Sequence, residues 1–170
     1  MSYYYHFRDY DEEVITCVKK AGLSGSCGNI LDKLPEATIL VTPGNSFGIM
    51  DDGVDRAIRD FFGRDLETQI QELIMKHYNA TQGLPVGGCL VIPVKWYHDQ
   101  KRQKLKYILY MPTMKYPGIL PKTTQNARVV FRALECVLTH LPIKGMVLLS
   151  GICTGIGMMD ATEMVRQLIQ

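Results

Sequence analysis

Apolar and polar residues follow two different rhythms along the chain, and each rhythm predicts one kind of element. Short, mainly apolar or aromatic runs predict β-strands at 3–7, 25–30, 37–42, 88–94, 107–112 and 145–151. Longer segments, in which apolar residues recur every three or four positions, predict α-helices at 11–23, 54–62, 65–78, 124–141 and 160–170. Strands and helices therefore alternate along the whole chain.

Residues typical of helix ends support two of these helices. Lys19 and Lys20 stand near the end of the first helix, where positive charge suits the helix dipole, and Gly22 is the expected cap. The last helix begins with Asp160 and carries Glu163 three residues later, which is the spacing of a capping box.

An alternation of apolar strands with amphipathic helices is typical of the α/β class, in which a sheet lies between two layers of helices. The chain of 170 residues is long enough for one domain with a core, and it shows no repeat or linker, so we expect a single domain over 1–170. With 46% hydrophobic and 21% charged residues, the composition is that of a folded globular protein.

Charge and cysteine usage exclude several classes of protein. A net charge of +2 gives no drive toward nucleic acid or membrane, and the basic stretch 101–106 fits a solvated hairpin or loop. The N-terminal residues do not resemble a signal peptide, and no window approaches the roughly 20 apolar residues of a spanning helix. The five scattered cysteines lack disulfide or metal spacing. We expect a soluble cytoplasmic protein with reduced thiols, no metal site and no cofactor.

The first loop with candidate chemistry follows the strand at 37–42 and precedes a helix, a place where open α/β sheets bind ligands. It carries an amide at Asn45 and carboxylates at Asp51 and Asp52. Asn45 can contact sugar hydroxyls or position a water, and it can equally cap its own turn. Asp52 can hold a ribose hydroxyl, although capping of the next helix is slightly favoured for it. Asp55 is expected to be a partner of the helix dipole.

The second candidate loop, SGICTGIG at 150–157, also lies between an apolar strand and a helix. Its glycines would let backbone N–H groups approach an anion such as a phosphate, and a tight strand-to-helix turn is an equal alternative. Cys153 fits a small packing residue better than a nucleophile. Because loops at neighbouring parallel strand ends converge, a ligand with adjacent phosphates would fit between the two loops. Trp96 and Tyr97 are expected to be rim or core aromatics.

With GNI at 28–30, TPGNSFGIMDDGVDRAI at 42–58 and SGICTGIG at 150–157, the chain resembles the macro domain family of ADP-ribose-binding modules. The family's signatures are a G-D-I segment, an N-A-A-N sequence leading into a glycine-rich loop, and an S-T-G-I-F-G phosphate loop. They stand here in the same order and at compatible spacing. The segment 84–94 also matches, and the resemblance covers residues 25–170.

The sequence departs from the family pattern at several site positions. The family's adenine-contacting Asp corresponds to Asn29, and the first Asn of its amide pair corresponds to Thr42, whereas the second is retained as Asn45. The glycine run corresponds to 50–53, which keeps only its last glycine and contains two acids. Acids near the distal ribose would disfavour a distal phosphate and favour hydrolytic chemistry. The N-terminal strand and helix would supply the missing edge of the sheet.

The resemblance implies a three-layer α/β/α sandwich with a central mixed sheet and an ADP-ribose cleft. Adenine would lie near Asn29 and Ile30, the pyrophosphate over the loop at 150–157, and the distal ribose by Asn45 and Asp51. The ligand-binding residues that the matched motifs imply are Gly28, Asn29, Ile30, Ser46, Gly53, Val54, Ser150, Gly151, Cys153, Thr154, Gly155, Ile156 and Gly157.

Some members of the family hydrolyse ADP-ribose derivatives, and others only bind them. The leading hypothesis is therefore an ADP-ribose-binding domain that hydrolyses mono-ADP-ribosylated protein or ADP-ribose 1''-phosphate without a metal. Its catalytic water would be held by Asn45 and activated by Asp51 or Asp52. The alternatives are a non-catalytic reader of ADP-ribose and a scaffold domain with an inactive cleft. The expected partner is ADP-ribose or an ADP-ribosylated protein.

Overall fold

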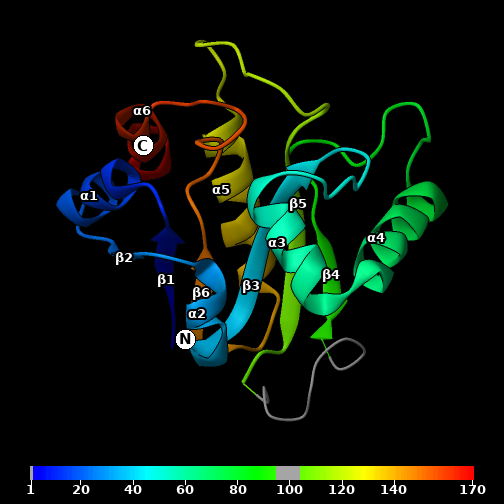
Figure 1. The fold of residues 1–170 in the computed structure, drawn as a ribbon, viewed down its shortest axis with the longest axis horizontal. Helices are drawn as coiled ribbons and strands as arrows, with labels where there is room; N and C mark the ends of the chain where they lie inside the picture. The colour runs from blue at the N-terminus through cyan, green and yellow to red at the C-terminus, as the bar shows by residue number, and fades with distance from the viewer. Residues whose placement is uncertain (1, 95–103) are drawn as a thin grey trace.

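The structure is a computed structural model that describes residues 2–94 and 104–170, and that part of the chain forms one six-stranded sheet (Figure 1). The strands are β1 (Ser2–Asp9), β2 (Ser24–Cys27), β3 (Ala37–Asn45), β4 (Leu90–Pro93), β5 (Tyr107–Met114) and β6 (Lys144–Leu149). They lie in the order β2-β1-β6-β3-β5-β4. Neighbouring strands are parallel, except that β4 runs antiparallel to β5 at one edge. The sheet is therefore mixed, as expected.

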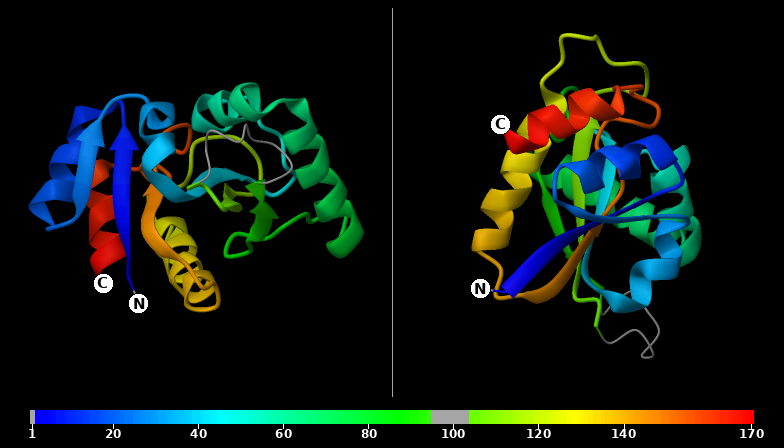
Figure 2. Two further views of the ribbon diagram at one scale, coloured as in Figure 1. Left: turned by 90° about the horizontal axis from the view of Figure 1, so that it is seen from below. Right: turned by 90° about the vertical axis from the view of Figure 1, so that its left-hand side faces the viewer.

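Helices cover both faces of this sheet (Figure 2). They are α1 (Glu12–Lys20), α2 (Ile30–Lys33), α3 (Gly53–Phe62), α4 (Arg64–His77), α5 (Asn126–Thr139) and α6 (Ala161–Ile169), with a short 3₁₀ turn, η1, at Leu34–Glu36. The buried side chains of α1, α5 and α6 belong to one hydrophobic cluster, and those of α2, α3 and α4 belong to a second. Each cluster lies against one face of the sheet, so the predicted three-layer α/β/α sandwich is confirmed.

The central strands are apolar because both of their faces are covered. In β3, Ile39 contributes to the cluster under α1, α5 and α6, whereas Leu40 contributes to the cluster on the opposite face. In β6, Val147 and Leu148 divide between the two clusters in the same way. Side chains of a strand alternate between faces, so a strand that is buried on both sides shows a continuous apolar run.

The N-terminal strand β1 lies inside the sheet, between β2 and β6. Its pairing with β6 runs in register from Ser2 beside Lys144 to Phe7 beside Leu149. The expectation that this strand forms the edge of the sheet is wrong, because the four-residue strand β2 adds beyond it. The ends of β1 and β6 consequently meet at one edge of the sheet.

Two local expectations at element ends are also wrong. The strand expected at 25–30 ends at Cys27, because the Asn29 side chain accepts a hydrogen bond from the backbone N–H of Leu31 (3.0 Å) and starts α2. The capping box at the last helix does not form. Asp160 makes no side-chain cap bond, and Glu163 instead accepts hydrogen bonds from Arg166 and Gln167.

Two of the expected features lie wholly or partly in residues that the structure does not describe. Trp96 and Tyr97, and the first half of the basic stretch 101–106, lie outside the described part of the chain. Among the helices of 2–94 and 104–170, none combines the length and the apolar character that crossing a membrane requires.

Candidate functional site

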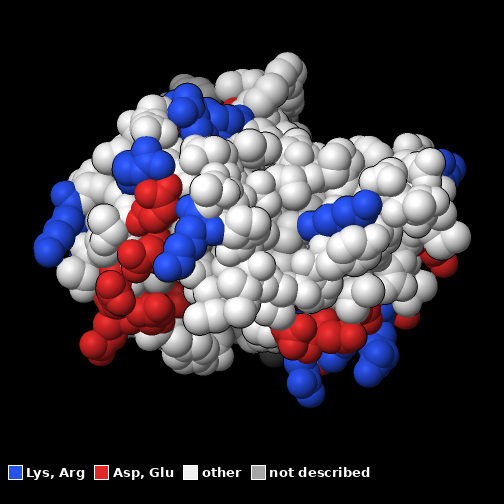
Figure 3. Space-filling model, turned by 90° about the horizontal axis from the view of Figure 1, so that it is seen from above, with Lys and Arg blue, Asp and Glu red and all other residues white. Residues whose placement is uncertain are grey.

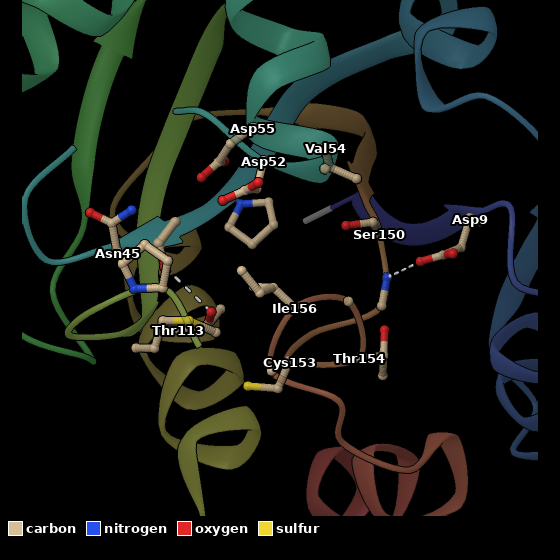
Figure 4. A pocket seen from close by; sticks show the side chains of 18 of the residues that line it. Asp9, Asn45, Asp52, Val54, Asp55, Thr113, Ser150, Cys153, Thr154 and Ile156 are labelled. Carbon is tan, nitrogen blue, oxygen red and sulfur yellow. Dashed lines mark hydrogen bonds between the residues drawn. The ribbon is translucent and has the colours of Figure 1, made fainter. Parts of the chain in front are cut away.

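A pocket of about 600 Å³ opens where the parallel strands of the sheet end (Figure 4). Its walls come from the segments that follow β1, β3, β5 and β6, which are brought to the same edge because these strands run in one direction. The lining residues are Asp9, Tyr10, Asp11, Pro43, Gly44, Asn45, Ile49, Asp52, Gly53, Val54, Asp55, Thr113, Met114, Pro117, Ser150, Gly151, Cys153, Thr154, Gly155, Ile156 and Gly157.

The 150–157 loop curls along one side of the pocket with backbone N–H groups available to a ligand. Cys153 adopts a left-handed conformation with φ of 66°, which turns the direction of the chain within the loop. Within the described part of the chain, the N–H groups of Cys153, Gly155 and Ile156 have no hydrogen-bond partner. Successive N–H groups in such a turn form an anion-binding concavity.

Cys153 itself is a packing residue in this loop. Its side chain is buried within the cluster of α1, α5 and α6, and burial raises the pKa of the thiol to about 12. A thiol with so high a pKa is almost wholly protonated at neutral pH, and the thiolate is the nucleophilic form. The geometry therefore favours the packing interpretation over the nucleophile.

The segment that follows β1 forms the second wall of the pocket. One carboxylate oxygen of Asp9 accepts a hydrogen bond from Gly151 N–H, and the other accepts from Asp11 N–H, both at 2.9 Å. Tyr10 lies beside them with 73% of its surface exposed. Asp9 thus fastens the 150–157 loop to the end of the neighbouring strand.

Asn45 lines the third wall, but most of its side chain serves its own turn. Its amide oxygen accepts hydrogen bonds from the N–H groups of Phe47 (3.0 Å) and Ile49 (3.3 Å), and its Nδ2 donates to the Ile49 carbonyl (2.8 Å). The backbone N–H of Asn45 donates to the Tyr110 hydroxyl, which donates in turn to the Asn45 carbonyl. One amide N–H remains for a ligand.

Asp55 is a functional candidate that the sequence did not single out. Its side chain lines the pocket although the residue is only 7% exposed, and it accepts a hydrogen bond of 2.6 Å from the Thr42 hydroxyl. Burial raises the pKa of this carboxyl to about 8, and the nearby acids Glu67 and Asp52 act in the same direction. A signal was available: Thr42 is a polar residue in a largely apolar strand, and a buried polar residue needs a partner.

The two neighbouring acids Asp51 and Asp52 have different surroundings. Asp52 occupies the N-cap position of α3 yet makes no side-chain cap bond, and it lines the pocket beside Asp55 (Figure 4). The capping role favoured for it is therefore wrong. Asp51 does not line the pocket, because its carboxylate is ion-paired with Arg59 at 2.9 Å. Adjacent residues on an extended segment point apart, so these two acids do not act as a pair.

The residues expected at the adenine end do not line the pocket. Gly28, Asn29 and Ile30 lie at the junction of β2 and α2, where Asn29 caps the helix and its carbonyl accepts a hydrogen bond from Arg8. Ser46 is buried under the loop and also lies outside the lining. The structure does bring together the remaining expected residues, namely Asn45, Asp52, Gly53, Val54, Ser150, Gly151, Cys153, Thr154, Gly155, Ile156 and Gly157.

No cluster of three or more metal-ligating side chains occurs in the part of the chain that the structure describes. The lining of the pocket, over the same residues, contains four aspartates and no lysine, arginine or histidine. Its hydrogen-bond donors are therefore backbone N–H groups and uncharged side chains such as Asn45, Ser150 and Thr154.

Comparison with known protein families identifies the fold. The model of the macro-like domain matches residues 13–165. The chain belongs to the macro-like domain family. The match includes the segment after β3 and the 150–157 loop, and the suspected macro domain membership is thereby confirmed.

Solved structures share the fold of this macro-like domain. The macrodomain of Thermus aquaticus DarG is 20% identical with a TM-score of 0.64, and 83% of each chain is covered. The macrodomain of Mycobacterium tuberculosis DarG is 19% identical with a TM-score of 0.66, over 85% of this chain and 84% of that one. Thermosipho africanus DarTG, solved in complex with ADP-ribose, is 14% identical with a TM-score of 0.65, over 98% of this chain and 49% of that one. At these identities the likeness shows the fold alone.

Proposed function

We propose that the pocket binds ADP-ribose and that this macro-like domain hydrolyses ADP-ribose derivatives, either mono-ADP-ribosylated protein or ADP-ribose 1''-phosphate. Two stretches of backbone that line the same pocket carry the proposal, through their N–H groups. One is the 150–157 loop, and the other is the uncapped first turn of α3 at Gly53 and Val54. Helix N-termini and nests of N–H groups bind phosphates, so a diphosphate matches both stretches.

A diphosphate in this position would leave the adenosine at one end of the pocket and the distal ribose at the other. At the β1 end, the exposed ring of Tyr10 offers a surface for the adenine to stack on. At the other end, Asn45, Asp52 and Asp55 offer polar groups to the distal ribose, which is the ribose that does not carry adenine. The proposed adenine position therefore moves from Asn29 to Tyr10. The complex of Thermosipho africanus DarTG with ADP-ribose supports the choice of ligand.

Asp55 is the candidate catalytic residue for hydrolysis. Because its pKa is raised to about 8, it holds a proton at neutral pH that it can donate to a leaving group, and its ionised form can accept a proton from water. General acid–base help of this kind typically contributes about 10²–10⁴-fold in rate. This role replaces the one expected for Asp51.

A non-catalytic reader is the second candidate, and the Asn45 side chain favours it. An amide that already makes three hydrogen bonds to its own turn has little capacity left to hold a catalytic water. A reader would bind ADP-ribose through the same N–H groups and leave modified substrates intact.

The binding test is a titration with ADP-ribose, followed by thermal unfolding. At a hundredfold excess over Kd, ADP-ribose should stabilise the protein by about 2.7 kcal/mol. The variant Gly155→Glu places a carboxylate among the phosphate donors, in open space and without backbone strain, and should weaken binding at least about tenfold. The control Met75→Glu adds the same charge on the exposed face of α4 and should bind normally. Absence of any stabilisation by ADP-ribose would favour the inactive scaffold.

The hydrolysis test measures release of ADP-ribose from a mono-ADP-ribosylated protein and of phosphate from ADP-ribose 1''-phosphate. Wild-type protein should release product from at least one of them. Asp55→Asn should lower that rate about 10²-fold or more while ADP-ribose still binds. Binding without release from either substrate would identify a reader.

A further inference from the structure

The two ends of the pocket carry carboxylates in different states. At the β1 end, both oxygens of Asp9 are engaged by backbone N–H groups. At the opposite end, Asp52 makes no cap bond to α3. Asp55 is more than nine-tenths buried, and its one hydrogen bond, from Thr42, leaves the second oxygen without a partner within the described residues. Figure 4 shows Asp52 and Asp55 side by side on the α3 side of the pocket.

The two arginines nearest in sequence to these two acids, Arg56 and Arg59, pair with other carboxylates, and Arg56 lies 3.9 Å from Asp60. The guanidinium of Arg59 pairs with Asp51 (2.9 Å), Asp60 (3.1 Å) and Glu67 (3.7 Å). Figure 3 looks onto the edge where the pocket opens, and it shows acidic side chains in two groups with mostly uncharged surface between them. The distal-ribose end therefore has unpaired acceptors and no cation of its own among the described lining residues.

The carboxylates at the distal-ribose end of the pocket would favour some ADP-ribose derivatives over others, according to the charge of the substituent on that ribose. A phosphate on the distal ribose would place two negative charges beside Asp52 and keep Asp55 protonated, whereas a cation there would pair with Asp52 and favour the ionised form of Asp55. Charges a few ångströms apart in a partly buried site interact strongly, so the sign of the substituent's charge decides whether a ligand is favoured. A guanidinium has a further advantage at this end of the pocket, because its fork of N–H groups can bond two carboxylates at once.

We propose that the pocket selects ADP-ribose compounds whose distal ribose carries a positively charged nitrogen group, and rejects those that carry a phosphate. This inference rests on the proposed function, because it takes the diphosphate to lie between the 150–157 loop and α3. Two sources supply the chemistry: the guanidinium of an ADP-ribosylated arginine side chain, and the pyridinium ring of NAD⁺. Asp52 and Asp55 are the specificity-determining residues.

Proton release from Asp55 on ligand binding provides a second test of this charge selection. The groups that act on it are the Thr42 hydroxyl of β3, Tyr110 of β5, Glu67 of α4, and Asp52 at the N-cap of its own helix. A cation bound beside Asp55 favours the ionised form and opposes the burial that raises its pKa. Binding of the cationic ligand at pH 7 should therefore release more protons than binding of ADP-ribose, which titration calorimetry in buffers of different ionisation enthalpy measures directly.

The test compares Kd values for ADP-ribose, ADP-ribose 1''-phosphate, NAD⁺ and a peptide ADP-ribosylated on arginine. We expect one or both cationic ligands to bind about tenfold more tightly than ADP-ribose, and the 1''-phosphate about tenfold more weakly. A comparison of the Kd values for the arginine peptide and for NAD⁺ distinguishes the guanidinium from the pyridinium as the preferred group. Asp52→Asn should reduce these differences several-fold. The control Asp60→Asn removes an exposed charge from the same helix outside the pocket and should leave them unchanged.

The outcomes separate this inference from the proposed function. If ADP-ribose binds but the 1''-phosphate binds equally well or better, the charge selection is wrong and the ADP-ribose site stands. The same conclusion follows if Asp52→Asn and Asp60→Asn have the same effect. If ADP-ribose itself fails to bind, the proposed function fails, and the inference fails with it.

Discussion

Thr42 and Asp55 show how burial changes the role of an acidic side chain. Asp55 lies in the first turn of α3, where an exposed carboxylate would only complement the helix dipole. Here the helix packs onto β3, the carboxyl is taken out of water, and the Thr42 hydroxyl becomes its hydrogen-bond donor. The sequence alone does not distinguish an exposed Asp55 from a buried one. The raised pKa that lets Asp55 hold a proton therefore depends on packing.

The pKa of Asp55 leads to a prediction for stability against pH. Its folded-state pKa of about 8 lies above its ordinary value of 3.8, so between these values the folded protein holds a proton that the unfolded chain has lost. Stability should therefore fall as pH rises from about 4 to about 8. Asp55→Asn removes this titration and should be more stable than wild type at pH 8 by about 1–3 kcal/mol, with no such gain near pH 4. Urea unfolding from pH 4 to 9 measures the difference. Parallel profiles for the two proteins would show that Asp55 is not buried in its protonated form.

At the scale of elements, the end of β3 sets the shape of the pocket. Pairing with β5 shifts register between Gly44 and Asn45, and the buried Tyr110 hydroxyl bridges the backbone of Asn45 at that point. Gly44 packs directly against the Tyr110 ring. The bend that aims the Asn45 loop at the pocket therefore depends on a position with no side chain.

A methyl group at Gly44 would overlap the Tyr110 ring, which is fully buried and has no space to move into. Gly44→Ala should lower the free energy of unfolding by about 1–3 kcal/mol. Gly118→Ala is the matched control, because an added methyl there meets nothing within 4 Å, and it should change stability by less than about 0.5 kcal/mol. Urea unfolding of both variants measures the difference, and equal effects would mean that the ring yields.

The amphipathic helices were predictable because a wide apolar stripe persists over several turns. The helix expected at 65–78 is α4, Arg64–His77, and β3 begins where the apolar run at 37–42 predicts it. The four-residue helix α2 was missed, because it is too short to show a period and its N-cap, Asn29, stands in what resembled a strand. The capping box failed because Arg166, one turn later, is the better partner for Glu163.

At the scale of the whole molecule, the pocket joins distant parts of the chain. The loop after β3, up to Gly53, and the loop at 150–157 were predictable as a pair, since each lies between an apolar strand and a helix. Asp9, Tyr10 and Asp11 were not, because their place follows from the pairing of β1 with β6, which links the two ends of the described chain. Local patterns carry no information about which distant strand will be the neighbour.

The internal position of β1 predicts that the N-terminal strand is part of the core. Phe7 is fully buried against the cluster of α1, α5 and α6, whereas Tyr4 on the same strand is 52% exposed. Phe7→Ala should therefore lower the free energy of unfolding by about 3–5 kcal/mol. Tyr4→Ala should cost less than about 1 kcal/mol, as is usual for exposed positions. Denaturant titration of both variants compares them, and a small loss at Phe7 would mean that β1 docks only loosely.

The pairing of β1 with β6 also affects the stage of synthesis at which the protein can bind a ligand. Within this domain, β1 is synthesised before β6 and has to wait for it to acquire this partner, and such long-range pairing forms late and slowly. A nascent chain halted before residue 144 contains Asp9 and Asn45 but lacks β6 and the 150–157 loop. Nucleotide binding would thus require that β6 and the 150–157 loop have been synthesised.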